Sequence, residues 1–376
     1  MTEQMKGEIS RRTFIQRGVV AGAALTAVTA PGAAAALRKS KVYTGKRLDD
    51  FKFSFAIPAQ DPENTMYFVN KYIFGPQEGI NLLLYSADSA LNFVKLTASH
   101  HFNASHPSAF FLALVKDQGL PVRCYFDNMD INIFGWAVKP DSPIQTPKDL
   151  EGKNVAIGLV GWDAVYNPIV AAAGGDYKKI TYIPVGLGYG PRLDALESGR
   201  VDAIVTWNGE FPGFNIAARE AGKGALRFIS GEQWLKAASN GWVAAEDRLV
   251  PDRELLIRAA RAQAKSMWFV KTNPAASAKI FHKYYPNLYP KPADAIAIAK
   301  DYNDTGFTPG PSGTLNNGLG WNNAKRWQNQ LDAMYEFKLT KHHLQAHDMF
   351  TNDMIKEIND FSKQDVITFA KNYKFH

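Results

Sequence analysis

The sequence has one cysteine, Cys124, in 376 residues. A single cysteine excludes a disulfide framework and every zinc or iron–sulfur site that needs two or more thiolates. After residue 36 no segment stays apolar for 18 residues, which excludes a membrane-spanning helix there. The chain also has no run of basic residues. Its formal charge of +7 is dispersed among Asp and Glu, so a nucleic-acid partner is not expected.

The composition is that of a folded protein. Hydrophobic residues make up 46% of the chain and aromatic residues 12%. Such a chain buries enough apolar surface to offset the entropy lost on ordering, which excludes extensive disorder. At roughly 100–200 residues per domain, the length predicts two domains, or three at most.

The N-terminus has the parts of an export signal. Residues 10–15 (SRRTFI) precede an apolar, small-residue segment at 18–30, which is followed by Pro31 and four alanines ending at Ala36. A positive head, a short apolar segment and small residues at the cleavage site define such a signal. The arginine pair resembles the twin-arginine type, which implies the Tat export machinery as a partner. An N-terminal membrane anchor is the alternative, but the apolar segment is shorter than the ~20 residues that span a bilayer.

We therefore expect residues 1–36 to be a signal peptide that is cleaved near Ala36, and the mature protein to be periplasmic. The signal contains four basic and two acidic residues, so its removal lowers the formal charge from +7 to +5.

In the rest of the chain, short apolar runs alternate with amphipathic ones. Residues 140–143 (PDSP) have the composition of a linker, which predicts a domain boundary after residue 140. Strands that alternate with helices indicate open α/β units with parallel sheets. Strands are expected at 51–57, 80–85, 122–126, 131–138, 154–160, 180–185 and 203–207. Helices are expected at 66–73, from Ser86 or Asp88, and at 108–115, 163–173, 192–198, 253–271, 275–283, 293–300, 322–337 and 351–373.

Four stretches resemble the periplasmic substrate-binding proteins of ABC importers for nitrate, sulfonates, taurine and thiamine-type pyrimidines. They are residues 116–122 (KDQGLPV), 149–156 (DLEGKNVA), 195–203 (ALESGRVDA) and 347–352 (HDMFTN). The chain departs from these proteins at residues 105–108 (SHPS), where relatives often have an Asp followed by small residues.

The resemblance implies a two-lobed periplasmic-binding-protein fold of type II. Two open α/β domains would enclose a ligand cleft, and the C-terminal part would be helical. Residues 37–140 would form the first part of lobe 1, residues 141–235 lobe 2, and residues 236–376 the return to lobe 1 and the C-terminal helices.

The function that the resemblance implies is capture of a small organic solute, without catalysis or a cofactor. Hinge closure would enclose a sulfonate or an aromatic carboxylate, or a neutral pyrimidine. The monomer would then deliver it to an ABC permease and ATPase. A periplasmic solute sensor is one alternative. Another is an enzyme similar to the pyrimidine-precursor synthases, but these use a cysteine-rich motif that this chain lacks.

In open α/β sheets, ligands bind in loops beyond the carboxyl ends of the strands. In lobe 1 these loops contain the candidate residues Gln60, Asp88, Ser105, His106 and Asp127. In lobe 2 they contain Trp162, Asp163, Tyr189, Trp207 and Glu210. Trp162 is the strongest candidate because it follows Gly161 at a strand-to-helix turn, where backbone donors hold anions and an indole offers a flat wall.

For several candidates a structural role competes with ligand contact. Asp88 suits a helix N-cap, and Glu210 suits an ion pair between the lobes. His106 is a lone histidine, which is more often a hydrogen-bonded structural residue than a ligand group.

Other patterns carry no chemistry. Residues 186–191 (GLGYGP) misplace the third glycine of a dinucleotide fingerprint. The adjacent histidine pairs at 100–101 and 342–343 lack an obvious acidic partner in the sequence, so we expect surface residues and no metal site.

Overall fold

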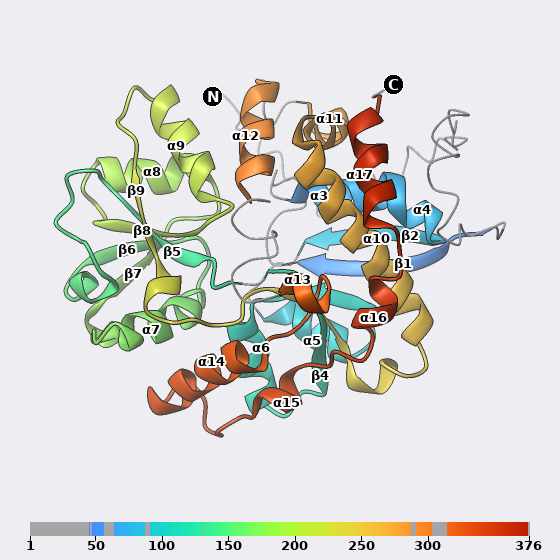
Figure 1. Ribbon diagram of the computed structural model, residues 1–376. Helices are drawn as coiled ribbons and strands as arrows, with labels where there is room; N and C mark the ends of the chain where they lie inside the picture. Colours follow the sequence, from blue (N-terminus) through green and yellow to red (C-terminus); the bar gives the residue numbers. More distant parts are fainter. Residues whose placement is uncertain are drawn as a thin grey trace, which may run out of the picture.

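The computed structural model describes residues 45, 47–55, 64–86, 91–129, 131–286, 291–302 and 314–374. The expected signal at residues 1–36 lies outside the described residues. Within them, no helix has the length and apolar character needed to cross a membrane. Two five-stranded sheets, each flanked by helices, form two lobes (Figure 1).

The first sheet, with the helices on its faces, is called the first lobe here. Its strand order is β2-β1-β3-β10-β4. The strands are β1 (Asp49–Phe55), β2 (Ile80–Ser86), β3 (Ala104–His106), β4 (Val122–Asp127) and β10 (Gly241–Ala245). Apolar residues recur in β1 because helices cover the sheet. Phe51 and Phe53 are fully buried, and their rings lie 6.0 and 4.3 Å from the ring of Trp242 in β10.

The second sheet and its helices form the second lobe. Its strand order is β7-β6-β8-β5-β9. The strands are β5 (Phe134–Val138), β6 (Asn154–Ile157), β7 (Thr181–Pro184), β8 (Ala203–Trp207) and β9 (Arg227–Ser230). The helices of this lobe are α7 (Asp163–Ala172), α8 (Tyr189–Glu197) and α9 (Phe211–Glu220).

The remaining helices pack mainly on the first lobe, although α12 also contacts α9, and both α6 and α14 contact α7. Before β10 they are α3 (Thr65–Val69), η2 (Asn70–Phe74), α4 (Gly75–Gln77), α5 (Asn92–Ala98) and α6 (Ala109–Asp117). After β10 they are α10 (Arg253–Thr272), α11 (Pro274–Tyr284), α12 (Pro292–Tyr302), α13 (Thr314–Asn317), α14 (Ala324–Glu336), α15 (Ala346–Met349), α16 (Ile355–Ile358) and α17 (Lys363–Asn372). Short helical turns are η3 (Pro147–Leu150), η4 (Tyr177–Lys179), η5 (Gly231–Gln233) and η6 (Glu246–Arg248).

The sheets are mixed, whereas the sequence predicted parallel ones. In the first sheet β10 runs antiparallel to β3 and β4, and in the second β5 runs antiparallel to β8 and β9. Both are the strands that have just arrived from the other lobe. A strand that enters from the edge facing the partner sheet runs opposite to strands that end at that edge.

The chain therefore crosses between the sheets earlier than the sequence indicated. Residues 131–138 were assigned to lobe 1, but β5 pairs with β8 and β9 of the second sheet. The first crossing lies at residues 128–133, and the linker-like residues 140–143 follow β5 inside the second lobe. The second crossing, between β9 and β10, lies at residues 231–240.

Two expected helices also differ. The helix expected from Ser86 or Asp88 begins at Asn92, because Ser86 belongs to β2. The single helix expected at 351–373 is divided into α16 and α17, and Ser362 caps α17 by accepting a hydrogen bond from the Asp365 backbone N–H at 3.1 Å.

Three histidines of these pairs have acidic partners, which the sequence did not show because they are distant in the chain. His100 lies 2.9 Å from Asp247, His342 lies 2.9 Å from Asp117, and His343 lies 2.8 Å from Asp332.

Candidate functional site

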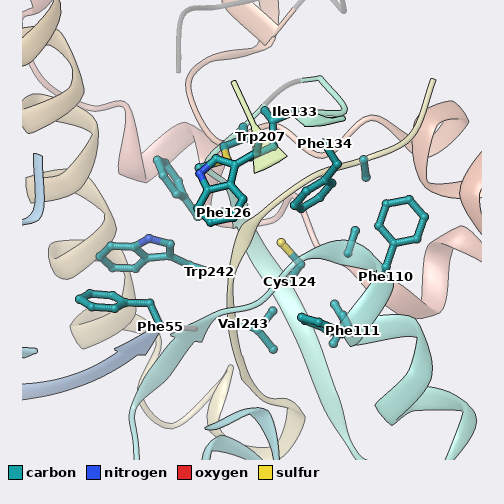
Figure 2. Close-up of a cluster of buried hydrophobic side chains, with 14 of the residues drawn as sticks. Phe55, Phe110, Phe111, Cys124, Phe126, Ile133, Phe134, Trp207, Trp242 and Val243 are labelled. Carbon is teal, nitrogen blue, oxygen red and sulfur yellow. The ribbon is translucent and has the colours of Figure 1, made fainter. Parts of the chain in front are cut away.

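A cavity lies between the two lobes. Its empty volume, including the open mouth, is about 590 Å³. Most of the lining is aromatic or aliphatic, with a few neutral polar side chains. The lining residues are Phe55, Asn64, His106, Ser108, Phe111, Met129, Ile133, Phe134, Trp162, Val165, Tyr166, Trp207 and Asn240. The surrounding apolar side chains include Trp207 and Phe134 from the second lobe, Ile133 from the first crossing, and Phe55, Phe111 and Trp242 from the first lobe (Figure 2).

The first lobe contributes the ends of its parallel strands. Phe55 ends β1 and His106 ends β3, and the two residues pair across the strands. His106 Nε2 lies 3.4 Å from Asn128 Nδ2, which also lies 3.5 Å from the hydroxyl of Tyr67. Burial lowers the pKa of His106 to about 3, so the ring lines the cavity as a neutral donor and acceptor.

The N-terminus of α6 also faces the cavity. Ser108 is its N-cap, and its Oγ accepts a hydrogen bond from the Phe111 backbone N–H at 3.2 Å. Asn240 lies beside it, since Ser108 and Asn240 form an antiparallel bridge. The hydroxyl and the amide therefore meet at one end of a helix whose dipole is positive there.

The second lobe contributes a wall of rings. Trp162 is the N-cap of α7, and its ring lies 5.5 Å from that of Trp207 at an interplanar angle of 74°. Gly161 turns the chain there with φ +93. Gly158 leaves room for the Trp162 ring, because a Cβ at that position would lie 2.7 Å from the indole.

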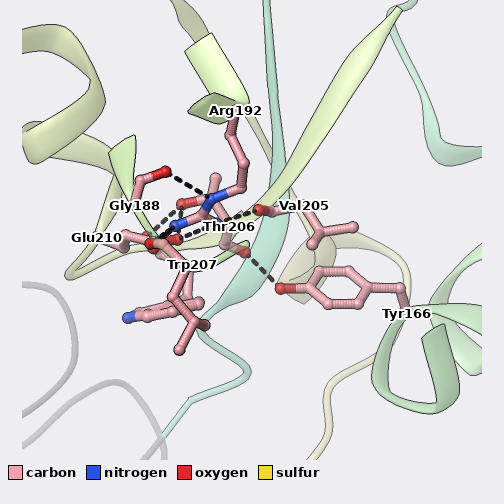
Figure 3. A network of polar contacts seen from close by, with 8 residues as sticks. Tyr166, Gly188, Arg192, Val205, Thr206, Trp207 and Glu210 are labelled. Atoms are coloured by element: carbon pink, nitrogen blue, oxygen red, sulfur yellow. Dashed lines mark hydrogen bonds and ion pairs between the residues drawn. The ribbon is translucent and has the colours of Figure 1, made fainter. Parts of the chain in front are cut away.

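A buried ion pair supports this wall from behind (Figure 3). Arg192 and Glu210 form a bidentate pair, and both side chains are almost fully buried. Thr206 Oγ1 donates to Glu210 Oε2 at 2.9 Å, and the hydroxyl of Tyr166 donates to the Thr206 carbonyl at 3.0 Å. Arg192 also donates to the Leu187 and Val205 carbonyls at 2.8 and 3.3 Å. The network thus connects the cavity residue Tyr166 to the strand end that presents Trp207.

Of the residues proposed from the sequence, the cavity brings together His106, Trp162 and Trp207. Gln60 and Asp88 lie outside the described residues. The other five candidates are absent from the lining. They are Ser105, Asp127, Asp163, Tyr189 and Glu210.

Each of these five has another environment. Ser105 precedes His106 in β3, so strand alternation turns its side chain to the opposite face of the sheet. Asp127 accepts from the Met129 backbone N–H at 3.1 Å, and Asp163 lies 3.4 Å from the Asn167 amide. Tyr189 begins α8 and packs edge-to-face on Phe214 at 5.1 Å. Glu210 is in an ion pair, as expected, but its partner Arg192 belongs to the same lobe.

Ten lining residues were not among the candidates predicted from the sequence. Phe55 and Phe134 are strand residues whose alternation indicated burial but not a cavity. Asn64 and Asn240 follow no predicted strand, since Asn64 precedes α3 and Asn240 precedes the unpredicted β10. The others are Ser108, Phe111, Met129, Ile133, Val165 and Tyr166. Ser108 had a signal, because it lies within residues 105–108 (SHPS), where the chain departs from the proteins it resembles.

The lining has no charged side chain, and no group of three His, Cys, Asp or Glu residues in the described ranges could hold a metal ion. What remains is a largely apolar space lined by aromatic rings and a few neutral hydrogen-bonding groups. This arrangement suits non-covalent binding of a small organic molecule.

Solved structures with a similar fold include two binding proteins and a DszB mutant. The alkanesulfonate-binding protein SsuA from Xanthomonas axonopodis pv. citri, bound to MOPS, is 11% identical with a TM-score of 0.60, and the match covers 82% of this chain and all of that one. The aliphatic sulphonate-binding protein SsuA from Escherichia coli is 14% identical with a TM-score of 0.56, covering 81% and 92%. A mutant of DszB in complex with biphenyl-2-sulfinic acid is 13% identical with a TM-score of 0.52, covering 82% and 98%.

At these identities the similarity establishes the fold alone. The two lobes, the mixed sheets and the crossing strands are those of a periplasmic-binding-protein fold, as the sequence predicted. No curated protein sequence matches the chain significantly. The model of the NMT1/THI5-like family matches residues 74–277, more than half of the chain. This segment ends in the first turn of α11 and contains every strand of both sheets except β1. The chain therefore belongs to the NMT1/THI5-like family.

Proposed function

We propose that the protein is the solute-binding component of an ABC-type import system and performs no catalysis. The observation that supports this proposal is the inter-lobe cavity, because residues from both sheets line it and neither lobe alone would enclose a ligand. A ligand held between two lobes stabilises the closed arrangement, and closure is what a membrane partner recognises.

The lobes would close about the two crossing segments, whose described residues are 128–129, 131–133 and 231–240. Hydrogen bonds join these segments to each other. The Asn132 backbone N–H donates to Glu232 Oε2 at 3.0 Å, and the Asn132 amide donates to the Leu235 carbonyl at 3.0 Å. Arg326 of α14 pairs with Glu232 at 2.6 Å. Segments tied together in this way would bend as one hinge.

For the ligand we propose an aromatic solute with one polar group. The rings of Trp162 and Trp207 support the aromatic part. The carboxylate or sulfonate expected from the sequence is supported by the positive end of α6 and by the sulfonate-binding proteins that share the fold. A neutral head matches the uncharged lining equally well.

The remaining assignments follow from this role. We propose export through the twin-arginine route with cleavage near Ala36, a periplasmic location, a monomeric state, and delivery of the solute to a permease and ATPase. A solute sensor would bind its ligand in the same cavity, so transport is tested separately by ligand-dependent stimulation of the partner ATPase.

Binding is tested by a thermal-shift screen of the purified protein against sulfonates, aromatic carboxylates, nitrate, bicarbonate and pyrimidines. A ligand at 100 times its dissociation constant adds about 2.7 kcal/mol to the free energy of unfolding. That increase raises the melting temperature clearly. If no compound raises the melting temperature of folded, ligand-free protein, the proposal is rejected.

Replacing Trp162 should weaken binding of any aromatic hit. In Trp162→Leu we expect the dissociation constant to rise about tenfold, which corresponds to about 1.4 kcal/mol, because the ligand loses one ring of its wall. Titration calorimetry measures the change. Trp268→Leu is the matched control, since Trp268 is similarly buried (9% exposed, against 5% for Trp162) but lies in α10 outside the cavity lining. Equal losses in the two variants would contradict a contact between Trp162 and ligand.

A further inference from the structure

The two lobes are also joined outside the cavity, by helix α12. This helix belongs to the first lobe, because it packs on α11 and its apolar residues Ala295, Ile298 and Ala299 are buried. Residues three and four positions apart lie on one side of a helix, so a single face of α12 is anchored there. The helix also contacts α9 of the second lobe, and in Figure 1 it stands between α9 and α11.

Two ion pairs connect the start of α12 to the end of α9. Arg219 Nη2 lies 3.1 Å from Asp294 Oδ1, and Lys291 Nζ lies 2.7 Å from Glu220 Oε1. The Asp294 backbone N–H donates to the Lys291 carbonyl at 3.0 Å, so these two residues share the first turn of the helix. Each lobe thus presents one cation and one anion, and each charge faces its opposite. These four residues are called the clasp here.

The clasp can open without unfolding either lobe, because it is made of exposed charges. The side chains of Arg219 and Lys291 are each 65% exposed, and that of Glu220 is 48% exposed. Exposed ion pairs add little to the free energy of unfolding. The open and closed arrangements of a two-lobed protein differ far less in free energy than the folded and unfolded states do. The same small contribution therefore changes the populations of the two arrangements.

The contact between α14 and α7 is of a different kind. Arg326 of α14 pairs with Glu232 in the second crossing segment, so α14 is tied to the hinge. Beside it, the hydroxyl of Tyr177 in η4 donates to the Phe337 carbonyl at 3.1 Å. The clasp helices α9 and α12 lie at the opposite end of the lobes from α14 (Figure 1). When the lobes rotate about the hinge, contacts beside it change little, whereas α9 and α12 move apart.

We propose that the clasp draws the two lobes together before any ligand arrives. Its strength sets the fraction of ligand-free protein that is closed, and salt weakens it because exposed charges are screened. The apparent affinity for a ligand of the closed form then includes this closed fraction. Only this effect on affinity rests on the proposed binding function, since the clasp acts on the lobes themselves.

Fluorescence energy transfer between dyes on the two lobes measures the closed fraction without ligand. Asp194 on α8 and Val250 in the first lobe are exposed, so Asp194→Cys and Val250→Cys can carry the dyes, whereas the native Cys124 is buried. Raising sodium chloride from about 10 mM to about 1 M shortens the Debye length from ~30 Å to ~3 Å. We expect the ratio of closed to open molecules to fall about fivefold, the combined effect of two exposed ion pairs.

Charge-swapped variants test whether the clasp is the cause. Arg219→Glu with Glu220→Arg, called the α9 swap, places like charges opposite each other at both pairs and leaves the net charge unchanged. At low salt it should lower the ratio of closed to open molecules at least about fivefold. Adding Lys291→Glu and Asp294→Lys restores attraction with reversed polarity, so the ratio should return to within about twofold of wild type.

The control reverses a charge in an exposed pair that does not join the lobes. Arg253 pairs with Glu357 at 2.7 Å within the first lobe, so Arg253→Glu should leave the ratio of closed to open molecules unchanged.

The outcomes separate this inference from the proposed function. The inference is overturned if neither salt nor the α9 swap changes the closed fraction of ligand-free protein. It is also overturned if the effect of the α9 swap persists after α12 is swapped as well. Both results leave the binding function intact, because no ligand is used. For any compound that the thermal-shift screen identifies, the α9 swap should raise the dissociation constant by at most the factor by which it lowers the closed-to-open ratio. If no compound binds, the binding function fails, and the energy-transfer measurement still decides the inference.

Discussion

The Glu210→Gln variant should lose about 3–5 kcal/mol of the free energy of unfolding at pH 7. Arg192 is fully buried, and Glu210 is the carboxylate that neutralises it. Glutamine preserves the shape and one hydrogen-bond acceptor but removes the charge, so the guanidinium remains in the interior without a counter-ion. Urea unfolding followed by circular dichroism measures the loss as a lower midpoint at an unchanged slope.

Two further variants decide whether charge is the cause. Glu220→Gln removes a carboxylate from an exposed pair with Lys291, so stability should change little. Replacing both partners, Arg192→Met with Glu210→Leu, removes the buried charges together and should recover most of the stability lost in Glu210→Gln. A Glu210→Gln variant as stable as wild type would show that the guanidinium does not depend on this carboxylate.

The Glu210→Gln variant should also bind ligand more weakly, because the ion pair supports the wall formed by Trp162 and Trp207. Glu210 accepts from Thr206, whose carbonyl accepts from Tyr166, and Trp207 lies between Thr206 and Glu210 in the chain. The role was partly foreseen: the position of Glu210 after β8 indicated an ion pair. Its partner could not be identified, because Arg192 is 18 residues earlier and only the fold places it beside the carboxylate.

The positions of most strands and helices could be predicted from the sequence for a physical reason. Strands buried on both faces appear as apolar runs, and helices between them keep their own period, so β1, β6, β8 and α10 could be located to within a few residues. The crossing strands could not be assigned. β5 and β10 are as apolar as their neighbours. No local sequence pattern indicates that each strand pairs antiparallel in the sheet of the other lobe, after the chain has crossed.

The cavity was harder to predict than the fold. Trp162 and His106 could be found because they follow strands at turns, where ligands of α/β sheets bind. Asn240 ends one crossing segment and Phe134 directly follows the other, so both depended on the topology that the sequence did not show. Ser105 and His106 illustrate the precision required, since a shift of one residue in a strand moves a side chain to the other face of the sheet.

His106 should make the stability of the protein depend on pH. Between pH 7 and pH 5 we expect wild type to lose about 2 kcal/mol more of its free energy of unfolding than the His106→Gln variant loses. Glutamine keeps a donor and an acceptor in the cavity but does not titrate in this range. Urea midpoints of both proteins at half-unit pH steps give the difference between the two curves.

The direction follows from the two pKa values of this histidine. In the unfolded chain His106 takes up a proton near the ordinary pKa of about 6.5. In the native protein burial lowers its pKa to about 3, and the groups around it are the Asn128 amide, the Tyr67 hydroxyl and the ring of Phe53, none of which carries a charge to stabilise an imidazolium. Between these values the unfolded state holds the extra proton, so the stability is complete above pH 6.5 and falls as the pH decreases toward 3. Parallel curves for wild type and His106→Gln would mean that the native imidazole accepts the proton readily. The cavity would then carry a positive charge in acid, and ligand heads would be selected by charge as well as by hydrogen bonding.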